Sequence, residues 1–146
     1  MSTIKEYLTQ DHSRCDELFA TMEDKATQSL ESAKEACQEF VNETERHFQM
    51  EERIMFLEFE TKTGMIQGPT AMMRHEHVQM RSLMKQMLEA IDAGNKDKFF
   101  GLSETLMILI QQHNMKEEQM LYTMAQQHLS ADSDRIVSMM ESMIVE

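Results

Sequence analysis

The stretch HFQMEERIMF, residues 47–56, has a close counterpart in HNMKEEQMLY, residues 113–122. In both, a histidine is followed four positions later by two glutamates, then by a variable residue, two apolar residues and an aromatic one. The segments that open the two copies also match, since DHSRCDELF (11–19) aligns with EHVQMRSLM (76–84). The sequence therefore predicts a helical hairpin that is written twice.

Long segments without helix-breaking residues alternate with short turn-forming stretches. The chain has one Pro and four Gly, which favours an all-α fold. Each segment carries an apolar stripe at helical period, and short connections make consecutive helices antiparallel. We predict a single domain over residues 1–146 that contains an up-down-up-down four-helix bundle, about 5–128, with helices over 5–27, 30–61, 70–93 and 96–128.

The tail is predicted to form a further short amphipathic helix over about residues 132–145. Ile136, Met140, Met143 and Ile144 fall on one side of it. The pattern leaves open whether this side packs on the bundle, on a second copy of the chain or on another protein.

The charge and the cysteines narrow the class of protein. A formal net charge of −12 argues against nucleic acid and anionic membranes as partners. The start of the chain lacks the apolar core of a signal peptide, and no apolar run approaches membrane-spanning length. Cys15 and Cys37 are too few for a disulfide framework and are expected to be small buried thiols. We therefore expect a cytoplasmic protein.

The segment RHEHVQM (74–80) contains two histidines that point to different sides of a helix. The stripe read through His77 is methionine-rich and apolar, whereas the stripe read through His75 is polar. The internal repeat agrees, because it aligns His77 with His12. We therefore expect His77 to point inward and His75 to lie on the surface.

The turns place four inward histidines at one height in the bundle. In an antiparallel hairpin, two residues at equal distance from the turn are level with each other. The midpoint of His12 and His47 lies in the first predicted turn, and the midpoint of His77 and His113 lies in the last. The midpoint between His47 and His77 is also at a turn. Two glutamates, one helical turn from their histidines, join the same level: Glu51 and Glu117.

Buried carboxylates need partners or a metal ion, because isolated buried charges are very costly. A structural zinc ion would leave part of this donor set unused, and calcium or magnesium prefers oxygen ligands throughout. Four imidazoles and two carboxylates suit two ions of iron or manganese with the carboxylates between them. A network of His–Glu hydrogen bonds is the alternative, and thiolate ligation by Cys15 is a weaker one. The Glu-x-x-His motif of ferritin-type di-iron bundles is absent.

With these residues, the sequence resembles the hemerythrin-like family, in particular its His-His-Glu (HHE) cation-binding branch. The pattern H…HxxxE…H…HxxxE is met in order over about residues 5–128. The resemblance implies a non-haem di-iron centre, for which manganese or zinc could substitute, with these ligands: His12, His47, Glu51, His77, His113 and Glu117. The fifth histidine of oxygen-carrying hemerythrins is missing, since Met73 and Arg81 flank His77 at its expected positions.

The expected function is to bind or sense O2 or NO, or to handle iron under oxidative or nitrosative stress. The alternatives are a di-iron enzyme that reduces peroxide or activates oxygen, an iron-storage protein or an iron–sulfur repair protein. The sequence leaves open the roles of five residues near the predicted site: His75, His128, Cys15, Glu118 and Tyr122. Of these, Tyr122 is expected to be a packing aromatic rather than a redox group.

Overall fold

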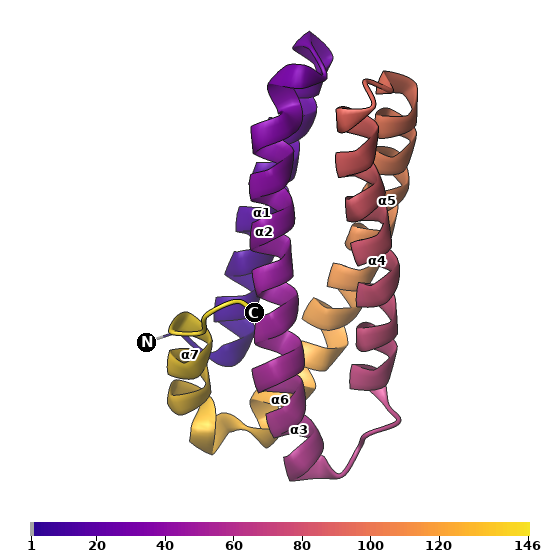
Figure 1. The fold of residues 1–146 in the computed structure, drawn as a ribbon. Coiled ribbons are helices and arrows are strands. Elements are labelled where there is room, and N and C mark those ends of the chain that lie inside the picture. The colour runs from indigo at the N-terminus through magenta and orange to yellow at the C-terminus, as the bar shows by residue number, and fades with distance from the viewer. Residues whose placement is uncertain (1) are drawn as a thin grey trace.

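The computed structural model describes residues 2–146, which form an all-α bundle of two helical hairpins (Figure 1). One hairpin pairs α1 with α2, and the other pairs α4 with α5 (Figure 1). We call the two sides of each hairpin its arms. α3 continues the arm that α2 begins, and α6 continues the arm that α5 begins. The helices have these bounds: α1 Ile4–Gln28, α2 Lys34–Met50, α3 Phe56–Thr63, α4 Pro69–Asp92, α5 Lys96–Lys116, α6 Tyr122–His128 and α7 Ser133–Glu141.

Local sequence signals set where the helices begin and end. Thr3 and Glu6 form a capping box at the start of α1, where each side chain accepts a hydrogen bond from the backbone of the other. The α3 arm ends at Gly64, whose φ of 75° is a left-handed conformation that glycine adopts without strain. Pro69 opens α4, and the Asn95 side chain caps α5. These signals explain why the predicted helix bounds agree closely with the observed ones.

The second arm of each hairpin contains a wider π-helical turn that the sequence did not predict. These turns cover Glu51–Met55, between α2 and α3, and Glu117–Leu121, between α5 and α6. A π turn adds one residue to the helical repeat and shifts the register of the buried side. In the last arm, Met120 is therefore 45% exposed, while its neighbour Leu121 is buried.

Two clusters of buried apolar side chains fill the bundle, one on either side of a polar layer. The first cluster includes Leu8 and Phe56 and lies toward the end that holds α7, and the second includes Phe19 and Met84 and fills the other end. His12 lies between Leu8 and Phe19 on α1, so the predicted histidines separate the two clusters. None of the helices within residues 2–146 is long and apolar enough to cross a membrane.

The tail helix α7 packs on the bundle of its own chain (Figure 1). Ile136, Val137 and Met140 are buried in the first apolar cluster. Arg46 on α2 donates a hydrogen bond to the carbonyl of Met140 at 3.0 Å. The helix predicted over about residues 132–145 is longer than the observed one, because α7 ends at Glu141 and Ile144 beyond it is 83% exposed.

Candidate metal centre

Side chains from four arms meet in the polar layer between the two apolar clusters. α1, α2, α4 and α5 each contribute one histidine, and each π-helical turn contributes one glutamate. All six are buried, and they form two groups in which the candidate ligand atoms lie within 4.8 Å of one another. The structure thus brings together every residue that the sequence placed at this level: His12, His47, Glu51, His77, His113 and Glu117.

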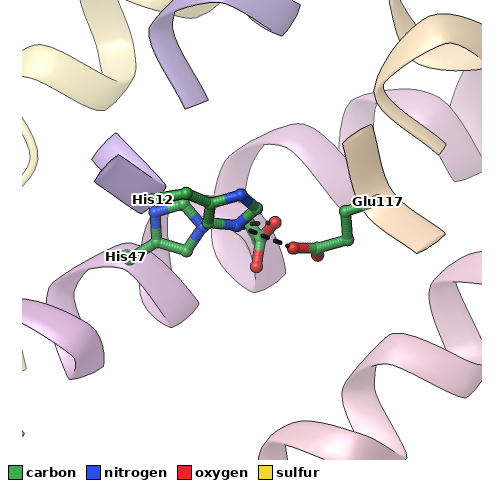
Figure 2. Close-up of side chains that lie close together, drawn as sticks. His12, His47 and Glu117 are labelled. Atoms are coloured by element: carbon green, nitrogen blue, oxygen red, sulfur yellow. Dashed lines mark hydrogen bonds and ion pairs between the residues drawn. The ribbon is translucent and has the colours of Figure 1, made fainter. Parts of the chain in front are cut away.

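The two groups share their carboxylates and divide the histidines by hairpin. His12 and His47 belong to one group, His77 and His113 belong to the other, and Glu51 and Glu117 belong to both. We call these groups the α1–α2 half and the α4–α5 half of the centre. The sequence left the pairing of the histidines open, and the hairpin geometry settles it. Figure 2 shows His12, His47 and Glu117 of the α1–α2 half pointing toward one another.

The glutamates bring the two halves together through contacts with histidines of both hairpins. Nε2 of His12 lies 3.0 Å from Oε1 of Glu117, and Nε2 of His113 lies 3.2 Å from the same oxygen. Oε1 of Glu51 lies 3.1 Å from Nε2 of His77, while its Oε2 lies 3.5 Å from Nε2 of His47. Each carboxylate is therefore placed to bridge the two halves.

Each histidine is oriented by a further carboxylate on its Nδ1 side. Those carboxylates accept a hydrogen bond from Nδ1–H, so Nε2 is left free to face the centre. The pairs and their distances are His12 with Glu118 at 2.7 Å, His47 with Asp11 at 2.7 Å, His77 with Glu52 at 2.6 Å, and His113 with Glu76 at 2.7 Å. The sequence analysis missed these outer carboxylates, apart from naming Glu118. The sequence did contain a pattern that could have identified them, because each outer carboxylate is directly adjacent in sequence to a predicted ligand.

Tyr122 is part of the centre, which corrects the expectation of a simple packing aromatic. Its side chain is fully buried, and its hydroxyl donates to Oε2 of Glu51 at 2.6 Å. The same hydroxyl lies 3.0 Å from Glu117 and 3.2 Å from Nε2 of His47. Phe56 occupies the corresponding position of the other arm and lies against the His77 ring. The α1–α2 half therefore has a phenol oxygen that the α4–α5 half lacks.

Several buried polar atoms of the centre lack a hydrogen-bond partner within residues 2–146. They are Oε1 of Glu51, Oε2 of Glu117 and Nε2 of both His77 and His113. Buried polar atoms are rarely left unpaired, because each costs roughly 1–3 kcal/mol. Carboxylate oxygens and imidazole nitrogens that converge in this way are a donor set for metal ions of the iron and manganese type. The residues present thus fit the metal that the sequence predicted.

Without an ion, the histidines and glutamates stabilise one another as charged pairs. Burial by itself would lower the pKa of His113, but the charges of Glu117 and Glu51 and the hydrogen bond with Glu76 raise it to about 9. Burial opposes the charged form of Glu51, yet the positive charge of His47 and the hydrogen bonds of the Glu51 carboxylate hold the pKa of Glu51 well below its usual range. Metal ions would replace these protons, because imidazole ligates only in its neutral form.

The remaining candidates lie outside both groups of potential ligands. His75 is exposed, as predicted. His128 is exposed as well, and its ring lies edge-on to Phe59. Cys15 is partly exposed rather than buried, and Glu118 serves His12 as an outer carboxylate.

Comparison with known proteins identifies one family. A family model described as the hemerythrin HHE cation binding domain matches residues 3–125. Comparisons with curated proteins and with solved structures find no match for the chain. The matched range contains both hairpins and all six residues of the two groups. Together with the buried His/Glu cluster, the match indicates a metal-binding site.

Proposed function

This chain belongs to the hemerythrin family of HHE cation-binding domains, and we propose that it is a non-haem di-iron protein. We propose further that it binds or senses O2 or NO, or handles iron under oxidative or nitrosative stress. The observation that carries the proposal is the pair of donor groups that share two carboxylates. Two ions with mixed nitrogen and oxygen ligands match this arrangement better than one closed zinc site.

The residues of the chain have distinct roles in this proposal. His12 and His47 would hold one ion, His77 and His113 the other, and Glu51 and Glu117 would bridge them. The outer carboxylates fix the tautomer of each imidazole and increase its basicity toward the metal. Iron in such a centre supplies reversible one-electron chemistry with small ligands. The apolar clusters on both sides exclude bulk water from it.

A small cavity beside the α1–α2 half supports the proposal that the ligand is diatomic. Its volume is about 20 Å³, and it borders both His12 and His47. Apolar side chains, among them Phe48, Met80 and Ile110, form most of its wall. A space of this size accepts one water-sized molecule, and its apolar wall favours a neutral one. O2 and NO meet both conditions.

The test is reconstitution of the metal-free protein with ferrous iron in the absence of air. We expect about two irons per chain, from the two donor groups, and an absorption change when O2 or NO is added. Circular dichroism before and after loading provides the control for folding. Binding of a single zinc ion in preference to iron, with no spectral response to either gas, would contradict the proposal.

Peroxide reduction is the second candidate, and the position of Tyr122 favours it. Its hydroxyl is an O–H donor in direct contact with Glu51 and Glu117, so a proton source is present at the centre. Enzymatic turnover of peroxide that is abolished by His47→Ala and slowed by Tyr122→Phe would establish this activity. Binding of O2 or NO without peroxide turnover would leave the first proposal standing alone.

A further inference from the structure

The internal repeat makes the two halves of the centre alike in their histidines but not in the charges around them. Arg81 and Asp16 are counterparts, since each lies four residues after the first histidine of its hairpin. Glu52 and Glu118 are counterparts as well, since each follows a bridging glutamate. Arg81 and Asp16 carry opposite charges, so the internal repeat does not extend to the charged residues around the histidines.

In the α4–α5 half, both outer carboxylates are neutralised by cations. Arg81 contacts Glu52 with both terminal nitrogens, at 2.8 and 3.1 Å. Lys116 forms an ion pair with Glu76. Each outer carboxylate of this half therefore has a cation beside it, although Arg81 is shared with Glu45 at 2.6 Å.

In the α1–α2 half, only one outer carboxylate has such a partner. Asp11 pairs with Arg14 at 2.8 Å. Glu118 forms no ion pair with a lysine or arginine in the part of the chain that the structure describes. Asp16 adds a further negative charge close to it, since Asp16 and Glu118 line the same surface hollow. The surroundings of this half are therefore more negative than those of the other.

The same hollow leads toward the α1–α2 half from solvent. It has a volume of about 450 Å³ and lies between α1 and α5. Asp16, Ile110 and Asn114 line both this hollow and the small cavity that borders His12 and His47. A divalent cation is attracted by the negative field of such an opening. The negative charge and the access from solvent thus both favour metal binding at the α1–α2 half.

We propose that the two metal ions bind in a fixed order, the first at His12 and His47 and the second at His77 and His113. Asp16 and Glu118 strengthen the first site, and Arg81 weakens the second by repelling the incoming cation. The inference rests on the di-metal centre of the proposed function but not on its reaction with O2 or NO.

Cobalt(II) is the probe for the order of binding. Crystals of the protein loaded with one equivalent should show anomalous scattering mainly at the α1–α2 half, and two equivalents should fill both. Equal density at the two halves, or density mainly at His77 and His113, would overturn the order alone. If cobalt and iron both failed to bind, the di-metal centre of the proposed function would fall as well.

Titration of charge variants tests the cause of the order. For the natural chain we expect two binding steps that differ roughly tenfold or more in affinity, because unit charges near a divalent ion change its binding by this order. Arg81→Gln should strengthen the second step, and Asp16→Asn should weaken the first, so both narrow the gap. Arg135→Gln on α7 and Asp92→Asn at the far end of α4 are matched controls, and neither should move either step. An unchanged gap in folded Arg81→Gln and Asp16→Asn proteins would overturn the assigned cause.

Discussion

The Tyr122 hydroxyl donates a 2.6 Å hydrogen bond to Glu51, which connects the last arm of the bundle to the second across the centre. Burial and the charges of Glu117 and Glu51 raise the pKa of Tyr122 well above its usual value, so the phenol keeps its proton in the metal-free protein. Neither partner has access to water that could replace the bond. The contact therefore holds a bridging carboxylate in place before any metal binds.

Tyr122→Phe should lower the free energy of unfolding of the metal-free protein. The expected loss is about 1–3 kcal/mol, because a buried charged acceptor loses its donor. Urea unfolding with a chelator present measures it. Tyr7→Phe is the matched control, since within residues 2–146 the one hydrogen bond of the Tyr7 hydroxyl is to the weak acceptor Sδ of Met50, at 3.8 Å. This change should cost under about 0.5 kcal/mol. Equal losses in the two variants would contradict this role of Tyr122.

His77→Ala and His75→Ala should differ sharply in metal content. His77 is fully buried at the centre, whereas His75, two residues away on α4, is exposed. We expect His77→Ala to lose at least one of two bound irons, because its half keeps a single imidazole. His75→Ala should bind iron as the natural chain does. Metal analysis after loading decides, and retention of full iron content by His77→Ala would refute the assigned ligand set.

The metal-free protein should lose stability as the pH rises from about 6.5 to 9. The pKa of His113 is about 9 in the folded protein and 6.5 ordinarily, so its proton stabilises the fold fully below pH 6.5. That contribution, about 3 kcal/mol, is lost as the pH rises through 9. Urea unfolding at pH 6.5, 7.5 and 9 in the presence of a chelator measures the effect. A metal-free protein whose stability increased over this range would contradict the charged pairing of His113 with Glu117 and Glu76.

Ile136→Ala should destabilise the bundle, although α7 follows the four arms. Ile136 is fully buried in the apolar cluster below the centre, and its truncation should cost about 2–5 kcal/mol. Met139 on the same helix is 41% exposed, so Met139→Ala should cost under about 0.5 kcal/mol. Thermal unfolding of the two variants compares them directly. Similar melting temperatures would mean that α7 contributes little to the fold.

The sequence alone was sufficient for the bundle and for the level at which its polar residues meet. Apolar stripes at helical period define the inward side of each arm, and turn positions define the height of each residue along it. These two quantities brought His12, His47, His77 and His113 together and separated His77 from His75. Both are local properties, since they depend only on spacing along the chain.

Only the tertiary structure decided how those residues are connected. The π-helical turns, which leave no local pattern, moved Leu121 inward in place of Met120 and carried Tyr122 into the centre. The division of the histidines into two halves and the choice of carboxylate for each Nδ1 depend on distances between arms. Spacing along one helix fixes the direction of a side chain but not its neighbour across the bundle, and hydrogen bonds and metal sites are set by that neighbour.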